Sequence, residues 1–164
     1  MPETTFNFEN IYATYSQKVL RLCLGYTGDA MQADDLLQEI FIKVWENQSK
    51  FRGESQISTW IYRIAVNTCL LHIRSTKNKN NVAINTDLTK IFEEQNDKEQ
   101  QINLLYQCIS QLNEADRVII TLLLEEVSYK EIAEVTALSE GNLRVKIHRI
   151  KQQLSEIYAK YERL

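Results

Sequence analysis

Proline and glycine are scarce along this chain. Among 164 residues there is one proline, Pro2, and there are four glycines. A β protein with many turns uses both residues freely, because turns depend on their special backbone angles. The composition therefore predicts helices almost throughout, that is, an all-α fold. Hydrophobic residues make up 44% of the sequence, which is enough to build a core.

Two helix-start signals lie close together in residues 128–153, SYKEIAEVTALSEGNLRVKIHRIKQQ. Ser128 is followed three residues later by Glu131. In such a capping box the serine hydroxyl accepts a backbone N–H, and the glutamate side chain reaches back to the serine amide. Ser139 offers a second N-cap, from which a longer helix would begin at Glu140. Two helices joined by the short turn at 136–138 predict a helix-turn-helix.

The second of these helices has the composition of a DNA-reading helix. Residues 142–154 contain no Asp or Glu, although the formal net charge of the chain is −3. A helix of one charge sign suits a major groove, where cations meet phosphates and forked donors meet base edges. An ordinary surface helix that is basic by chance is the alternative interpretation. The buried stripe would be Leu143, Ile147, Ile150 and Leu154. The candidate DNA contacts are Asn142, Arg144, Lys146, His148, Arg149 and Lys151.

Because the whole chain is acidic, its DNA affinity must come from such local basic patches. No apolar run approaches the ~18 residues of a membrane span. The first ten residues, MPETTFNFEN, lack the basic and apolar segments of a secretory signal. We therefore expect a cytoplasmic protein.

Three cysteines, Cys23, Cys69 and Cys108, each lie within an apolar helical pattern and are predicted to be buried free thiols. Cys69 and His72 have the spacing of half a metal site, but nothing elsewhere supplies the other half. We also find no nucleophile–base pair, paired carboxylates or phosphate-binding glycine loop. We expect no metal, no cofactor, no small-molecule substrate and no enzymatic activity.

Three amphipathic helices are predicted in the N-terminal half, over residues 6–27, 33–47 and about 59–75. In the second, apolar pairs recur every four residues and make a wide apolar stripe. Asp34 and Asp35 would lie in its first turn, where the helix dipole favours anions. Asp35, Gln38 and Glu39 line its polar side. This acidic face is either an ordinary solvated face or a docking surface for a basic partner helix, and the residues alone leave both open.

The third helix and the loop before it combine aromatic, guanidinium and amide groups. Phe51 lies in the polar loop 48–57. Along one side of the helix follow Trp60, Arg63, Asn67 and Arg74. Such groups suit unstacked single-stranded bases, whereas in the alternative interpretation Trp60 belongs to the core. Ser55 or Ser58 would cap this helix, and Leu71 would lie on its inner surface.

Residues 76–100 change to an Asn-, Lys- and Glu-rich composition with weak periodicity. They predict a flexible linker with a brief helical turn at 88–93. Helical periodicity returns in residues 101–112, and Asn113 can cap a further helix that braces the helix-turn-helix. The sequence thus predicts two small helical domains, residues 6–77 and 101–162, joined by a linker at 78–100.

Three stretches, taken in order, resemble a known family. DDLLQEIFIKVWEN, FRGESQISTWIYRIAVNTCLLHIR and LNEADRVIITLLLEEVSYKEIAEVTALSEGNLRVKIHRIKQQL are similar to extracytoplasmic-function (ECF) sigma factors, members of the sigma-70 family of bacterial RNA polymerase. The resemblance covers nearly the whole chain outside the linker and the termini. It implies a protein that binds core RNA polymerase, recognises the −35 and −10 promoter elements and starts promoter melting.

The resemblance also implies roles for matching positions. Helix 34–47 would dock on the polymerase clamp helices through Asp35, Gln38 and Glu39. The 48–74 element would read the −10 region and hold an extruded non-template base. Its contacts would be Phe51, Trp60, Arg63, Asn67 and Arg74. The helix-turn-helix would read the −35 element and touch the polymerase flap, and the linker would pass toward the RNA exit path. An anti-sigma factor is a further expected partner.

Two positions depart from the family pattern. Family members often carry Asp where this chain has Leu71, and Gly in the turn where it has Ala137. If the backbone at Ala137 is left-handed, alanine costs roughly 1 kcal/mol there. The main rival is a stand-alone helix-turn-helix regulator, which would bind duplex DNA by itself, usually as a dimer on paired half-sites. Residues 1–75 contain no ligand-pocket or receiver pattern that would favour it.

Overall fold

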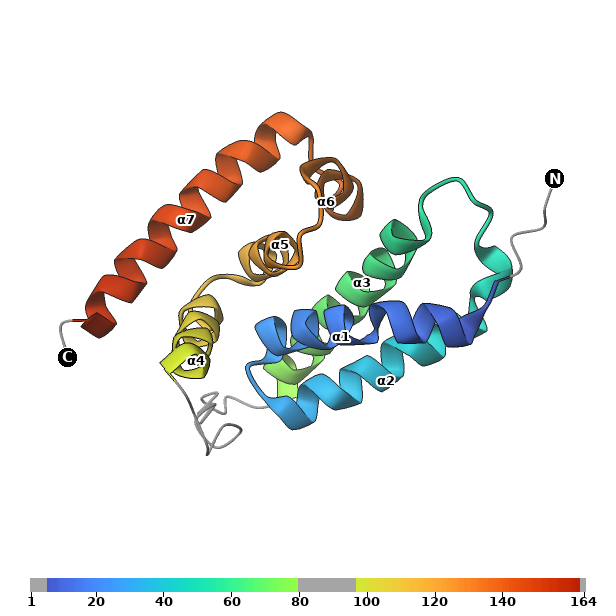
Figure 1. The fold of residues 1–164 in the computed structure, drawn as a ribbon, viewed down its shortest axis with the longest axis horizontal. Helices are drawn as coiled ribbons and strands as arrows, with labels where there is room; N and C mark the ends of the chain where they lie inside the picture. The colour runs from blue at the N-terminus through green and yellow to red at the C-terminus, as the bar shows by residue number, and fades with distance from the viewer. Residues whose placement is uncertain (1–5, 80–96, 163–164) are drawn as a thin grey trace.

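The structure is a computed structural model that describes residues 6–79 and 97–162, with side chains as far as His72 in the helix that ends at Lys79. Its elements are α1 (Phe8–Thr27), α2 (Ala30–Glu46), the 3-10 helix η1 (Gln48–Lys50), α3 (Ile57–Lys79), α4 (Asp97–Ser110), α5 (Glu114–Leu124), α6 (Tyr129–Thr136) and α7 (Glu140–Glu162). The described residues contain no strand, so the predicted all-α fold is confirmed (Figure 1). None of the described helices is long and apolar enough to cross a membrane.

The helices α1, α2 and α3 pack around one core. Each contributes residues at helical spacing, and all of the following are at most 1% exposed: Val19, Leu22, Cys23, Tyr26, Leu36, Ile40, Val44, Ile61, Ala65 and Cys69. Gly28 ends α1 in the left-handed conformation, at φ 64°. Asp29 then caps α2, because its carboxylate accepts the N–H groups of Met31 and Gln32 at 2.8 and 3.1 Å.

The α2 boundary corrects one prediction. The helix begins at Ala30, so Asp34 and Asp35 lie in its second turn and not in its first. The cap at Asp29 supplies the anion at the helix start instead. A second correction concerns Leu71, which is 60% exposed on α3 and does not lie on the inner surface. The two apolar residues before it, Cys69 and Leu70, are the ones turned inward.

The helices α4 to α7 form the second half, with α6 and α7 as the predicted helix-turn-helix. Ser128 caps α6 through the N–H of Glu131 at 3.2 Å, and Ser139 caps α7 through the N–H of Asn142 at 3.2 Å. Between them Ala137 adopts the left-handed conformation, with φ 60° and ψ 27°. The reading helix, α7, continues to Glu162.

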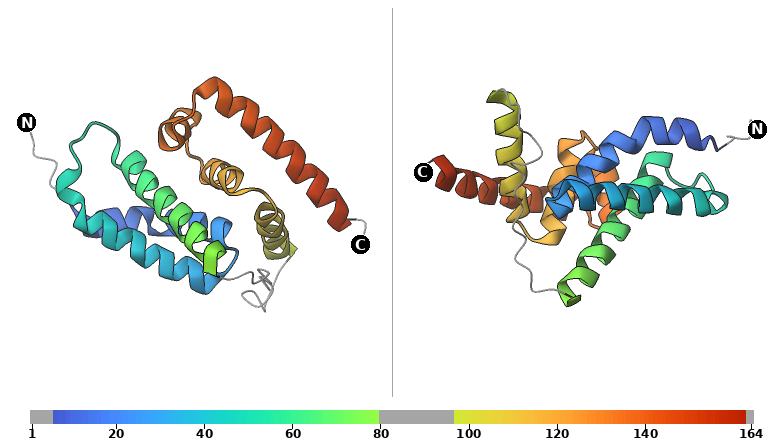
Figure 2. Two further views of the ribbon diagram at one scale, coloured as in Figure 1. Left: turned by 180° about the vertical axis from the view of Figure 1, so that it is seen from behind. Right: turned by 90° about the horizontal axis from the view of Figure 1, so that it is seen from below.

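The two halves touch along α1–α5 and α3–α6, whereas α7 lies on the far side of the molecule from α1, α2 and α3 (Figures 1 and 2). Gly25 makes the α1–α5 approach possible: a Cβ there would lie 2.5 Å from Thr121 Oγ1. The predicted linker partly becomes helix, because α3 runs to Lys79 and α4 begins at Asp97. The helical turn expected at 88–93 lies outside the described residues.

Candidate nucleic-acid interface

The reading helix α7 buries its predicted stripe and leaves its basic side exposed. Leu143, Ile147 and Ile150 are at most 3% exposed, and Leu154 packs against them. Five predicted contacts are exposed: Asn142, Arg144, His148, Arg149 and Lys151. In Figure 1, α7 runs along the edge of the molecule, away from α1, α2 and α3.

Lys146 is arranged differently from the other five. It is half-buried, and its ammonium Nζ lies 3.6 Å from the carboxylate Oδ1 of Asp116 on α5. This ion pair braces α7 against α5, so Lys146 lies toward the side of the helix that packs on its own domain. Arg144 is also held in place: its guanidinium carbon lies 5.1 Å from the centre of the Tyr129 ring on α6, a cation–π contact.

The aromatic residues predicted for the −10 element lie together. The Phe51 and Trp60 ring centres are 5.4 Å apart. Phe6 also packs edge-to-face against Trp60, with ring centres 6.0 Å apart. Both Phe51 and Trp60 are half-buried, so each packs within the fold and still presents part of a ring to solvent. The structure brings a stacking surface to the start of α3.

Arg63 and Asn67 are exposed one turn apart on α3, on the same side of the helix. Leu71 continues that line, and its 60% exposed side chain stands where family members often carry Asp. The side chain of Arg74 lies outside the described residues. The guanidinium Nη2 of Arg63 donates a hydrogen bond to the backbone oxygen of Glu134 on α6 at 3.3 Å.

The polar face of α2 carries the three predicted polymerase contacts. Asp35, Gln38 and Glu39 are all exposed, and Glu39 is 3.3 Å from Lys43 in an ion pair between neighbouring turns. Sequence reasoning missed Ile42, which is 56% exposed one turn beyond Gln38 and Glu39 on this face. An isoleucine outside the apolar stripe was the available signal. The face therefore offers an apolar centre as well as carboxylates, as protein interfaces commonly do.

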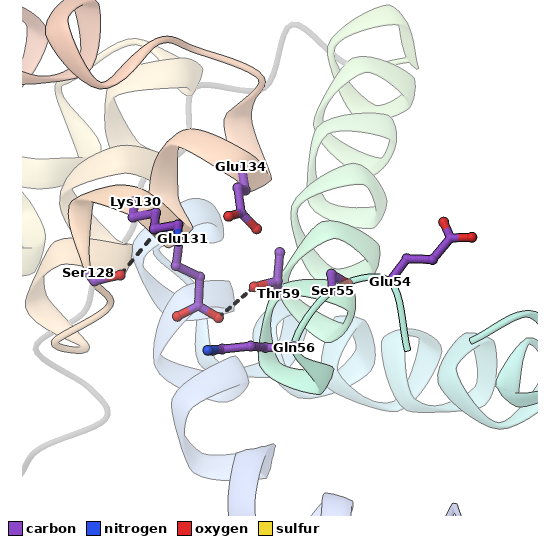
Figure 3. A pocket seen from close by; sticks show the side chains of 8 residues that line it. All are labelled: Glu54, Ser55, Gln56, Thr59, Ser128, Lys130, Glu131 and Glu134. Carbon is purple, nitrogen blue, oxygen red and sulfur yellow. Dashed lines mark hydrogen bonds between the residues drawn. The ribbon is translucent and has the colours of Figure 1, made fainter. Parts of the chain in front are cut away.

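The Glu131 side chain points away from its own helix cap. The capping box predicts that it reaches back to the Ser128 amide, but its Oε1 instead accepts hydrogen bonds from the Ser58 hydroxyl and from the Thr59 hydroxyl, the latter at 2.9 Å. Figure 3 shows the hydrogen bond to Thr59. Ser58 does not cap α3, because the helix begins at Ile57 and Ser58 lies within its first turn. The carboxylate of one half thus closes on the first turn of α3 in the other half, where the helix dipole favours an anion.

A shallow pocket surrounds this contact, between the loop before α3 and α6 (Figure 3). Three glutamates and one lysine line it among smaller polar residues: Glu54, Ser55, Gln56, Thr59, Ser128, Lys130, Glu131 and Glu134. The excess of carboxylates would repel a nucleic-acid phosphate. In this arrangement the loop before α3 faces an acidic surface of the same chain.

Further polar contacts join α1 to α5. Arg21 makes a two-point ion pair with Glu125, with Nε–Oε1 at 2.6 Å and Nη2–Oε2 at 2.8 Å. These hydrogen bonds raise the pKa of Arg21, so its guanidinium stays charged at every ordinary pH. Arg117 of α5 donates to the backbone oxygen of Tyr26 at 3.1 Å, and burial lowers the pKa of its guanidinium.

The cysteines are buried free thiols, as predicted. Cys23 and Cys69 face each other across α1 and α3 with their sulfur atoms 4.0 Å apart. That contact and burial raise the pKa of Cys69, which makes it a poor nucleophile. In the part of the chain that the structure describes, no group of three or more His, Cys, Asp or Glu side chains is placed to hold a metal ion.

Comparison with known proteins gives consistent matches. Residues 11–79 match the family model described as sigma-70 region 2, and residues 102–154 match that of sigma-70 region 4. The ECF RNA polymerase sigma factor SigM of Bacillus subtilis is 30% identical over 156 residues, which covers 92% of this chain and 94% of the relative. The RNA polymerase sigma-H factor of Pseudomonas aeruginosa is 29% identical, covering 91% of this chain and 84% of the relative.

Solved structures agree on the fold. The sigma factor RpoE of Bartonella quintana, solved with the anti-sigma factor NepR, superposes with a TM-score of 0.73 at 18% identity, covering 92% of this chain and 95% of the other. CnrH, solved with the cytosolic domain of CnrY, gives a TM-score of 0.70 at 18% identity, covering 93% and 88%.

Proposed function

This chain belongs to the ECF sigma factors of bacterial RNA polymerase, and we propose that three separate surfaces bind its partners during transcription initiation. The basic face of α7 reads the −35 element, the start of α3 reads and melts the −10 element, and the acidic face of α2 holds core polymerase. The observation that carries this proposal is the exposed face of α7, which is free of carboxylates for 13 residues (142–154) of an acidic chain.

At the −35 element, Asn142, Arg144, His148, Arg149 and Lys151 are the residues we assign to DNA. The start of a reading helix approaches base edges, so Asn142 is the first candidate for direct readout. Arg149, two turns further along the same line of α7, is the second candidate. Arg144 is pre-ordered on the Tyr129 ring and suits a phosphate. Lys146 contributes to DNA binding only indirectly, because its ion pair with Asp116 positions α7.

At the −10 element, the Phe51–Trp60 pair supports stacking with an unpaired base, and Arg63 and Asn67 supply donors along the same helix. Arg74 remains a predicted contact. Capture of a flipped base offsets the few kcal/mol that its unstacking costs. The mechanism has no covalent step: binding energy alone shifts the duplex toward the open state.

The closed arrangement of the two halves is not the promoter-bound one. Two promoter elements about two helical turns apart are separated by roughly 70 Å, at about 34–36 Å per turn. Glu131 on the −35 side is in hydrogen-bond contact with Thr59 on the −10 side. The contacts at Glu131, Arg63 and Arg21 must therefore break before one chain can bind both elements.

One of the similar folds, RpoE of Bartonella quintana, was solved with an anti-sigma factor, and we propose a partner of that class for this chain. It would act by covering the polymerase-binding surfaces and by keeping the halves closed. We place the protein in the cytoplasm, where polymerase and promoter are found. Core polymerase would be held at its clamp helices by α2 and at its flap by the helix-turn-helix.

Co-elution of the purified chain with core RNA polymerase on gel filtration tests the proposal. The wild type should co-elute, Glu39→Arg should weaken the complex by charge reversal on the α2 face, and Glu9→Arg, on α1, should leave it intact. A chain that runs apart from polymerase while binding duplex DNA would favour the stand-alone regulator and remove the melting role from residues 48–74.

A further inference from the structure

One exposed residue among the predicted DNA contacts of α7 is apolar. Val145 is 53% exposed, although the predicted DNA contacts around it are polar or charged. Val145 lies three positions after Asn142 and four positions before Arg149, so these residues follow one line along the helix. The buried stripe of α7 occupies the opposite side, with Leu143 and Ile147 at most 3% exposed. Val145 therefore contributes nothing to the core of its own domain.

Single exposed apolar residues are common on proteins and usually have no function. The position of Val145 sets it apart, because it lies in the second turn of the reading helix, where such helices approach base edges. Valine is also a weak helix former, so the helix gains no stability from it. Its stiff χ1 angle holds both methyl groups in one orientation, which lowers the entropy cost of a contact.

The major groove offers one apolar group on its base edges, the C5-methyl of thymine. We propose that Val145 contacts a thymine methyl group within the −35 element and selects for thymine at one position, between the bases approached by Asn142 and Arg149. This inference rests on the proposed function, since it requires that α7 reads the −35 element. It names an apolar specificity residue among polar neighbours.

Removal of the methyl group alone from DNA tests the proposal. Holoenzyme, reconstituted from core polymerase and the full chain, is used to select duplexes from a transcribed genomic fragment whose −35 region has been randomised. One library contains thymine and a second contains uracil in its place, which lacks only the methyl. We expect wild type to favour thymine at one −35 position and to lose about fourfold of that preference in uracil DNA, the value of one buried methyl group.

Two variants complete the test. Val145→Ser should lose the preference at the same position in thymine DNA and show no further loss in uracil DNA, while the other positions stay as in wild type. Tyr158→Ser, at another exposed residue of α7 (43% exposed), should select as wild type does. The proposal would be overturned if uracil were preferred at that position as strongly as thymine is, or if Val145→Ser kept the thymine preference. Either result would leave −35 reading by α7 in place. Absence of any −35 selection by the wild type would overturn both.

Discussion

The carboxylate of Glu131 on the helix-turn-helix accepts a hydrogen bond from the Thr59 hydroxyl on α3 at 2.9 Å. This contact joins the half proposed to read the −35 element to the half proposed to read the −10 element. It also places an anion at the first turn of α3, where the helix dipole would otherwise favour a DNA phosphate. We infer that the closed state competes with promoter binding.

Glu131→Gln should therefore favour the open state. The substitution weakens a charge-assisted contact but keeps the Ser128 cap, which uses the backbone N–H of residue 131. We expect promoter affinity to rise roughly threefold to tenfold, because less binding energy is used to open the chain. Fluorescence energy transfer between dyes on α2 and α7 should report a larger separation in the free variant.

The matched control is Glu134→Gln. Its side chain lines the same acidic pocket, but its contact with Arg63 is made by the backbone oxygen. It should leave the distance between the halves nearly unchanged. Equal dye separation in wild type and Glu131→Gln would show that this carboxylate does not hold the halves together.

Gly25→Ala should also open the closed state, by sterics and not by charge. A Cβ at Gly25 would lie 2.5 Å from Thr121 Oγ1, so α1 and α5 could not approach as closely. Hydrogen exchange at the backbone amides of α5 should become faster. Thr121→Ala, added to Gly25→Ala, should restore the protection of these amides. If the α5 amides of the double variant exchanged as fast as those of Gly25→Ala alone, the steric explanation would be ruled out.

Ala137→Gly should stabilise the protein by about 1 kcal/mol. The residue has φ 60°, where a Cβ is unfavourable and glycine is not. Urea unfolding measures the change in the free energy of unfolding. Ala159→Gly, within α7, should have the opposite effect and cost about 0.5–1 kcal/mol. Destabilisation by both substitutions would mean that the turn does not carry the expected strain.

Tyr26→Phe should change stability in a way that depends on pH. Burial raises the pKa of Tyr26 above its ordinary 10.0, and its hydroxyl has no hydrogen-bond partner among the described residues. The folded state thus keeps the phenol neutral, a contribution present below pH 10 and lost as pH rises beyond it. Each such tyrosine lowers the free energy of unfolding by about 1.4 kcal/mol per pH unit there.

Phenylalanine at position 26 removes this loss and the unsatisfied hydroxyl together. We expect a gain of about 1 kcal/mol at pH 7 and a flatter decline above pH 10, measured by urea unfolding over a pH series. Tyr12→Phe, at an exposed tyrosine, is the control and should follow the wild type. An identical alkaline decline in wild type and Tyr26→Phe would contradict the burial argument.

Local signals in the sequence predicted much of this structure. The caps at Ser128, Ser139 and Asn113 form as expected, because a cap depends on residues within one turn. The second half of the capping box failed at Glu131, because two hydroxyls from a distant helix compete for its carboxylate. Such a tertiary contact leaves no periodic trace.

The same limit applies to the candidate site. Helical spacing placed Arg63 and Asn67 on one exposed side of α3, but it could not show that Lys146 meets Asp116 on another helix. Leu71 was assigned to the core because apolar residues are usually buried. It is exposed because the packed face of α3 is too narrow to include it. Roles for individual residues at the promoter stay predictions that the substitutions above address.

The most direct test of sigma-factor function is transcription of fragmented genomic DNA by core polymerase with and without this chain, with all start sites mapped. Discrete new starts should appear only with the chain, and they should share one −10 and one −35 sequence about two turns apart. Arg149→Ala should weaken these starts. Start sites identical to those of core polymerase alone, from a chain that still binds duplex DNA, would contradict the account.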